Sequence, residues 1–139
     1  MLPKLPPAVE QFLHLPNPAV IACIRPDGFP MSVATWYEWS DGLILVNMHE
    51  KRDRLRWMRV NPKVSVTVLG KDWSKHVSMF GSIVRFEDDT TLADIDRLCL
   101  RYTGKPFARR TAKRVSAWIE PMGWHGWDDE GELSSRPPV

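Results

Sequence analysis

Six cationic side chains gather in a short stretch between two apolar segments of the chain. The apolar segments are Leu43–Met48 and Val64–Leu69, and the cations between them are Lys51, Arg52, Arg54, Arg56, Arg59 and Lys63, opposed only by Glu50 and Asp53. A helix that starts here has free backbone N–H groups beside cationic side chains, and both favour a bound phosphate or carboxylate. The pattern therefore predicts an anion-binding site at the start of a short basic helix, Arg52–Val60, between two strands.

Two of these arginines are best placed to hold the anion. In a helix, Arg52, Arg56 and Arg59 fall on one stripe at positions i, i+4 and i+7, whereas Arg54 lies in the first turn on a different side. We therefore expect Arg52 and Arg54 to bind the anion at the helix start. Arg56 and Arg59 could equally be solvated surface charges.

The sequence shows no other familiar catalytic pattern. The four histidines have no paired spacing typical of a metal site, and no serine or Cys–His arrangement indicates a covalent nucleophile. Neither a P-loop nor a G-x-G-x-x-G motif is present. We therefore predict no catalytic side chain and no metal, and we expect any chemistry to come from a cofactor.

Length and composition describe an ordinary folded chain. With 139 residues, 43% hydrophobic and 26% charged, residues 1–139 are expected to form one domain. No apolar run approaches the roughly 20 residues of a membrane span, and the first residues lack the apolar core of a secretion signal. Cys23 and Cys99 have no metal-ligand spacing, so we expect buried free thiols in a cytoplasmic protein.

The distribution of charge favours a small anionic ligand over nucleic acid. A second basic block without acids consists of Arg101, Lys105, Arg109, Arg110, Lys113 and Arg114. The two blocks and the seven tryptophans leave a nucleic-acid-binding barrel as an alternative. The net charge of only +2 and the acidic segment 128–132 oppose it, so we expect no nucleic-acid partner.

Hydrophobic patterning predicts a mainly β (α+β) fold with six strands and two or three peripheral helices. The expected strands are Ala19–Arg25, Met31–Trp39, Leu43–Met48, Val64–Leu69, His76–Phe86 and Arg114–Glu120. Besides the basic helix, we expect helices at Ala8–His14 and after Asp88 or Asp89, one of which would cap the helix. Short turns then make a small antiparallel barrel, with an N-terminal lead-in (1–18) and a C-terminal tail (122–139).

Four segments, in this order and spacing, carry a resemblance to a known family. They are A-V-I-A-C-I-R-P-D-G-F-P (19–30), L-I-L-V-N (43–47), K-R-D-R-L-R-W-M-R-V-N-P-K-V-S-V (51–66) and V-S-M-F-G-S-I-V (77–84). From about Ala19 to Pro121 the chain resembles the pyridoxine 5′-phosphate oxidase-like split β-barrel family, the FMN-binding split-barrel type. Within it, the chain looks like the small actinobacterial enzymes that use the deazaflavin coenzyme F-420.

The resemblance implies a cofactor site that is built at the interface of a homodimer. The cofactor phosphate would be held by Arg52 and Arg54, and the flavin-like ring would rest along the second strand. Further pocket residues would follow the third strand, in the next loop and on the fifth strand. The implied site residues are Val33, Ala34, Thr35, Asn47, Arg52, Arg54, Trp73 and His76.

Two departures from the family pattern favour coenzyme F-420 over FMN. FMN-binding members usually have an Arg on the second strand and a Lys at its end, where this chain has Val33 and Glu38. The F-420 oligoglutamate tail could be accommodated by Arg56, Arg59 or the basic block 101–114. The resemblance thus implies an F-420-dependent oxidoreductase acting on an electron-poor organic small molecule, with an FMN-dependent flavoprotein or a non-catalytic cofactor-binding protein as alternatives.

Overall fold

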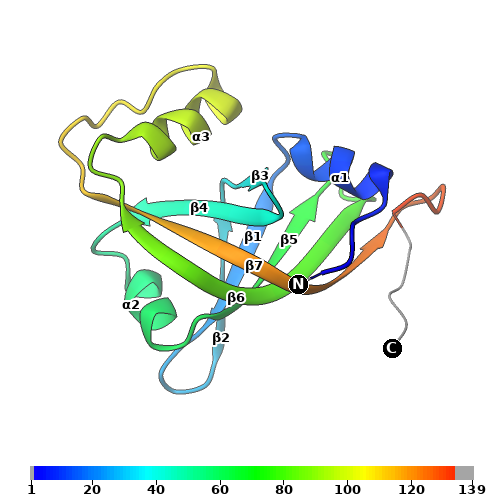
Figure 1. Ribbon diagram of the computed structural model, residues 1–139, viewed down its shortest axis with the longest axis horizontal. Helices are drawn as coiled ribbons and strands as arrows, with labels where there is room; N and C mark the ends of the chain where they lie inside the picture. Colours follow the sequence, from blue (N-terminus) through cyan, green and yellow to red (C-terminus); the bar gives the residue numbers. More distant parts are fainter. Residues whose placement is uncertain (1, 134–139) are drawn as a thin grey trace.

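One antiparallel sheet of seven strands and three helices make up the described part of the chain, residues 2–133, in the computed structural model (Figure 1). The strand order in the sheet is β2-β1-β5-β6-β7-β4-β3. The elements are α1 (Pro7–His14), β1 (Ala19–Ile24), β2 (Pro30–Thr35), β3 (Glu38–Ser40), β4 (Leu43–His49), α2 (Asp53–Val60), β5 (Lys63–Leu69), β6 (His76–Asp88), α3 (Ala93–Thr103) and β7 (Arg114–Trp127). The predicted class, a mainly β split barrel with peripheral helices, is confirmed, with seven strands instead of six.

The additional strand arises because the predicted strand Met31–Trp39 is divided in two. Its first part, β2, pairs with β1, and its last part, β3, pairs with β4 at the other end of the sheet. The link between them, Trp36–Tyr37, therefore connects the two edges of the sheet and closes the barrel. Tyr37 is fully buried, and its hydroxyl lies 2.9 and 2.8 Å from the carbonyl oxygens of Leu13 and Leu15.

The last strand is longer than predicted. β7 continues through residues 121–127, where a surface tail was expected, and its end pairs with the start of β6, His76 opposite Trp127. Pro121 cannot donate to a strand ladder and Gly123 weakens a strand, so the sequence indicated an end at Glu120. Register shifts between β6 and β7 accommodate the proline, and Gly123 lies directly beneath the Phe80 ring. Of the predicted tail, residues 128–133 follow the strand, and residues 134–139 lie outside the described residues.

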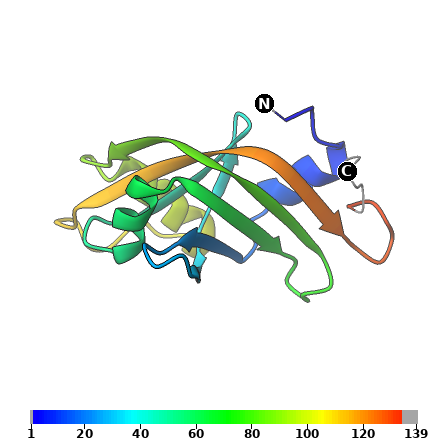
Figure 2. The same ribbon diagram turned by 90° about the horizontal axis from the view of Figure 1, so that it is seen from below.

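Helices α1 and α2 pack on one continuous apolar core, whereas the buried side chains of α3 form a small separate cluster. Strand residues such as Ile21, Val66, Val77 and Ile119 fill that core, and it extends to the buried face of α1. In the two ribbon views, α1 lies at one end of the barrel, whereas α2 and α3 lie toward the other end (Figures 1 and 2). The N-cap residue of α3 is Leu92, not Asp88 or Asp89, but the Asp89 carboxylate still accepts hydrogen bonds from two backbone N–H groups of the first turn.

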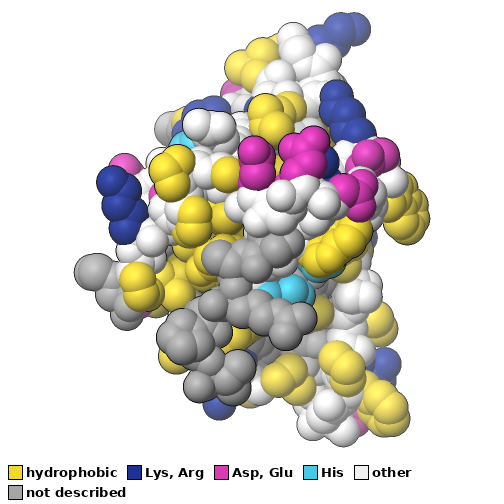
Figure 3. All heavy atoms as spheres, turned by 90° about the vertical axis from the view of Figure 1, so that its right-hand side faces the viewer, with side chains coloured by type: hydrophobic (Ala, Val, Ile, Leu, Met, Phe, Trp, Pro, Cys, Tyr) yellow, Lys and Arg dark blue, Asp and Glu magenta, His cyan; other side chains and the backbone are white. Residues whose placement is uncertain are grey.

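The surface on the side of α1 differs in charge from the side that carries the arginines of α2. Figure 3 shows acidic side chains gathered on that side, with exposed hydrophobic side chains around them. Cys23 and Cys99 are free and buried, as predicted. Within residues 2–133, no helix has both the length and the apolar character that crossing a membrane requires.

Candidate functional site

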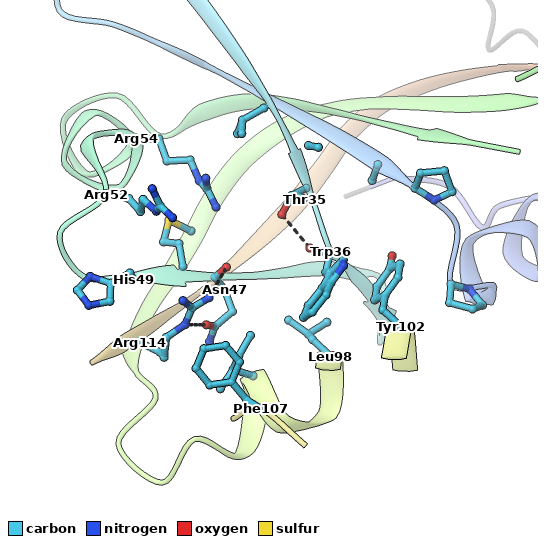
Figure 4. Close-up of a pocket in the computed structure, with 17 residues that line it drawn as sticks. Thr35, Trp36, Asn47, His49, Arg52, Arg54, Leu98, Tyr102, Phe107 and Arg114 are labelled. Carbon is cyan, nitrogen blue, oxygen red and sulfur yellow. Dashed lines mark hydrogen bonds between the residues drawn. The ribbon is translucent and has the colours of Figure 1, made fainter. Parts of the chain in front are cut away.

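A cavity of about 600 Å³ lies where β2, the end of β4, the start of α2 and helix α3 meet (Figure 4). One side of the cavity is cationic and the other is aromatic. Six of the eight site residues that the resemblance implied line this cavity together: Val33, Ala34, Thr35, Asn47, Arg52 and Arg54. Residues far apart in the sequence complete the lining, among them Trp36, Leu98, Tyr102, Phe107 and Arg114.

Three guanidinium groups form the cationic side. Arg52 immediately precedes α2, Arg54 lies in its first turn, and Arg114 begins β7. Burial and the neighbouring Arg52 lower the pKa of Arg54, and burial together with Arg54 and Arg52 lowers the pKa of Arg114. Among residues 2–133, no carboxylate forms an ion pair with any of the three. Guanidinium groups carry a positive charge in proteins, so the three repel one another, and an anion between them would relieve that repulsion.

An unpaired nitrogen identifies Arg54 as the centre of this group. Its Nε atom is buried and has no hydrogen-bond partner within the described residues. A buried donor without an acceptor is rare in folded proteins and costly, so a water or a bound ligand is expected to supply the acceptor. The N-cap residue Arg52 makes no side-chain capping hydrogen bond within residues 2–133, at the start of α2, where a helix leaves backbone N–H groups without intrahelical partners. The donors present therefore suit a phosphate or carboxylate.

The other two arginines of α2 have different surroundings. Arg56 forms an exposed ion pair of 3.1 Å with Asp53 on its own helix, and the Arg59 guanidinium lies 4.7 Å from the centre of the Phe86 ring. Neither side chain lines the cavity. Arg56 and Arg59 are therefore better described as surface charges than as members of the anion site.

Arg114 is the cation that sequence reasoning did not single out. It belonged to the second basic block, whose members prove to have unrelated roles. Arg101 binds backbone carbonyls of the segment 13–15, and Arg110 forms a bidentate ion pair with Asp96. Arg114 instead reaches the cavity because it is paired with His49, at the end of β4. This register is set by the pairing of two distant strands, which the local sequence pattern does not show.

The aromatic side is built around a stacked pair. The rings of Trp36 and Tyr102 lie 5.4 Å apart and are inclined by only 8°. Tyr102 donates a hydrogen bond of 2.8 Å to the Asn17 carbonyl oxygen, and burial raises the pKa of its hydroxyl. Trp36 remains 36% exposed and is labelled beside Thr35 in Figure 4. This arrangement offers a flat apolar surface to a planar molecule.

Two of the implied site residues lie elsewhere in the chain. Trp73 is 79% exposed in the loop between β5 and β6, and His76 packs edge-on against His125 with ring centres 5.6 Å apart. Neither side chain lines the cavity. Across residues 2–133, no three His, Cys, Asp or Glu side chains are grouped so that they could hold a metal ion.

Comparison with known proteins places the chain in a family. The family model described as pyridoxamine 5′-phosphate oxidase matches residues 5–128, so the chain belongs to that family, as the resemblance indicated. Members of this family bind flavin-type cofactors and are often oxidoreductases. No curated protein matches the sequence.

Solved structures share the fold over nearly the whole chain. A structure described as an F420 reductase is 26% identical, with a TM-score of 0.77 over 88% of this chain and 98% of that one. A conserved hypothetical protein from Mycobacterium tuberculosis is 23% identical, with a TM-score of 0.75 over 99% and 93%. An FMN-binding, pyridoxamine 5′-phosphate oxidase-related protein from Nostoc punctiforme is 11% identical, with a TM-score of 0.68 over 95% and 87%.

The residues of the cavity fit a flavin-type group. An arginine cluster with an unpaired buried donor matches a phosphate, and the remaining, largely apolar and aromatic walls of the 600 Å³ cavity match a planar ring system. Arg52 and Arg54 would hold the anionic end, together with Arg114. Val33, Ala34 and Thr35 on β2 would lie along the ring.

Proposed function

We propose that the protein is an F-420-dependent oxidoreductase. It would transfer a hydride between the reduced deazaflavin and an electron-poor organic small molecule, such as a conjugated ketone, a quinone or a tetrapyrrole. The observation that carries the proposal is the cluster of Arg52, Arg54 and Arg114 at one end of a cavity whose other walls are uncharged. The similarity to a structure described as an F420 reductase supports it.

In this proposal the chain binds and orients, and the cofactor supplies the hydride when bound. The edge position of β2 leaves one row of its backbone N–H and C=O groups without a strand partner in the described chain. These groups at residues 33–35 would hydrogen-bond to polar atoms of the ring and fix its plane. The Trp36–Tyr102 stack would then exclude water and hold a planar substrate near the ring, since positioning contributes much of such catalysis.

Local charges favour F-420 over FMN as the cofactor. Val33 offers no cation along β2, and Glu38 is engaged by Arg97, whose Nε lies 3.0 and 2.9 Å from its two carboxylate oxygens. The cationic groups that FMN-binding relatives usually carry near these places are therefore replaced by an apolar side chain and a neutralised acid. An FMN-dependent flavoprotein remains the second candidate, because the arginine cluster suits any phosphate.

A basic groove beside the main cavity would accommodate the oligoglutamate tail. A small cavity of about 170 Å³ shares Arg52 and Arg114 with the main cavity and is also lined by Lys51 and Arg109. It adjoins a wider groove along residues 108–113, to which Lys113 contributes. An oligoglutamate tail that leaves the arginine cluster in this direction would thus lie beside further cationic side chains. Arg56 and Arg59 line none of these cavities.

The protein would act as a homodimer with cofactor sites at the interface. Phe80, Val84 and Met122 on β6 and β7 are 59%, 54% and 65% exposed, which is unusual for large apolar side chains on one sheet. In the dimer, Trp73 and His76 would contribute to the cavity of the other protomer, which would account for their distance from the cavity of their own chain. Light scattering of the protein at micromolar concentration would give twice the chain mass, and a monomer would contradict this arrangement.

Titration with each cofactor tests the proposed function. Tryptophan fluorescence should fall on addition of F-420, because Trp36 lines the cavity, and the F-420 affinity should exceed the FMN affinity. Tight FMN binding without F-420 binding would favour the FMN-dependent alternative. F-420 binding without hydride transfer to any of a broad panel of activated alkenes and quinones would favour the non-catalytic binding protein.

A further inference from the structure

We infer that Asn47 is a positioning residue that acts on the bound anion through Arg114, without touching the anion itself. The inference rests on the proposed anion site but not on the identity of the cofactor. Asn47 lies on β4, only 6% exposed, at the edge of the cavity. Its side chain was expected to line the pocket as a direct binding residue.

All the polar atoms of the Asn47 side chain already have partners in the protein. The Nδ2 group donates to Asp89 Oδ2 at 3.2 Å and to Ser116 Oγ at 3.0 Å, which uses both of its hydrogens. The Oδ1 atom accepts a hydrogen bond of 2.9 Å from Arg114 Nε. The side chain therefore has no donor left for a phosphate or carboxylate.

The surrounding groups determine which way the Asn47 amide points. Ser116 Oγ donates its own hydrogen to Asp94 Oδ2 at 2.7 Å, so toward Asn47 it can only accept. Asp89 is likewise an acceptor here, because its two oxygens receive the backbone N–H groups of Asp94 and Ile95 at 3.1 and 2.9 Å. A flipped amide would place oxygen against two acceptors and N–H groups against a guanidinium. The oxygen must therefore face Arg114.

This network opposes the electrostatic repulsion on Arg114. Burial, Arg54 and Arg52 all lower the Arg114 pKa, which means that they disfavour its charge at this place, and Asp89 acts in the opposite direction. The hydrogen bond to Asn47 Oδ1 holds Nε, and Phe107 supports the guanidinium with its ring centre 5.0 Å away. Figure 4 shows Arg114 held beside Asn47 on the same side of the cavity as Arg52 and Arg54. Without the Asn47 side chain, Arg114 would keep only a 3.5 Å hydrogen bond to the Asn47 backbone carbonyl oxygen and the Phe107 contact, so repulsion by the other two cations could displace it.

A double-mutant cycle with inorganic pyrophosphate as the probe tests this inference. Pyrophosphate binding is measured by calorimetry for the wild type, Asn47→Ala, Arg114→Ala and the double variant. We expect Asn47→Ala to weaken binding roughly fivefold to tenfold when Arg114 is present, and by less than about twofold when it is absent. Equal losses in both backgrounds would overturn the inference, since they would show that Asn47 acts without Arg114.

A matched control separates positioning from stability. Ser116→Ala removes one of the two acceptors of the Asn47 Nδ2 group, while Asp89 still accepts from Nδ2 and keeps Oδ1 facing Arg114. It should therefore lower the melting temperature and change pyrophosphate affinity by less than about twofold. An affinity loss equal to that of Asn47→Ala would overturn the inference. If Asn47→Ala does not fold, Asn47→Ser, which is too short to reach Arg114, should show the same coupling.

The cycle also distinguishes this inference from the proposed function. A wild-type protein that binds pyrophosphate with the expected coupling but does not bind F-420 would leave the positioning role standing and remove the proposed cofactor. A wild-type protein that does not bind pyrophosphate would overturn the positioning role together with the arginine cluster as an anion site.

Discussion

Replacing Arg54 by alanine is the most direct test of the anion site. Arg54 contributes a half-buried guanidinium whose Nε has no partner within residues 2–133, so a bound phosphate would gain at least one charge-assisted hydrogen bond there. Losing such a bond costs about 1–3 kcal/mol. We therefore expect Arg54→Ala to weaken F-420 binding by about 1–3 kcal/mol, or roughly fivefold to 150-fold in Kd.

The same variant should not destabilise the protein without ligand. In the free protein, burial and the neighbouring Arg52 disfavour the charge on Arg54, Arg54 in turn disfavours the charge on Arg114, and the unsatisfied Nε donor of Arg54 is buried. Removing it relieves that repulsion and abolishes an unmet hydrogen bond. The melting temperature of the ligand-free variant should stay level or rise, whereas the stabilisation by saturating F-420 should shrink.

Arg56→Ala is the matched control for this prediction. It removes an arginine from the same helix, but one that is exposed, paired with Asp53 and outside the cavity. Its effect on F-420 affinity should stay within about twofold, in line with an exposed ion pair. The two variants are compared by fluorescence titration at fixed ionic strength. Unchanged affinity in Arg54→Ala, or equal losses in both variants, would refute the placement of the anion.

Three further variants test other parts of the structure. Trp36→Ala should remove much of the fluorescence response to F-420 and raise the KM of a planar substrate several-fold, since its ring offers the flat wall of the cavity; an unchanged KM would move the substrate elsewhere. Tyr37→Phe should lower the free energy of unfolding by about 1–2 kcal/mol in denaturant titration, because it removes a buried hydroxyl from the carbonyls of Leu13 and Leu15. Gly123→Ala should lower it by about 1–3 kcal/mol, because the new methyl group would meet the Phe80 ring, and a milder loss in a Phe80→Ala background would confirm that cause.

Much of the fold could be predicted because each element has a local signature. The strands β1, β4 and β5 and the helices α1 and α2 begin and end within a residue or two of the expected positions. Their apolar periodicity, flanking prolines and turn residues are properties of neighbouring residues. The division at Trp36–Tyr37 was missed because a strand that changes partners keeps the same alternation on both sides of the change.

The end of β7 was missed for the opposite reason. Pro121, Gly123 and Gly126 are local signals against a strand, but pairing with the long β6 overrides them. The sequence could not show that Gly123 is needed beneath Phe80, because that contact joins residues 43 positions apart. The pairing with β6 therefore determines where β7 ends.

By itself, the sequence determined the split-barrel class and the basic turn that begins α2, with Arg52 and Arg54 as its anion-binding candidates. The basic turn follows from residue types and spacings within one segment, whereas the split-barrel class follows from the order of several segments along the chain and their resemblance to a known family. Only the tertiary structure decided that Arg114 joins these two arginines, that Asn47 turns toward Arg114, and that Trp36 stacks on Tyr102. The physical reason is that strand register and the placement of α3 bring these groups together. Both depend on contacts between distant segments, which the neighbouring residues in the sequence do not reveal.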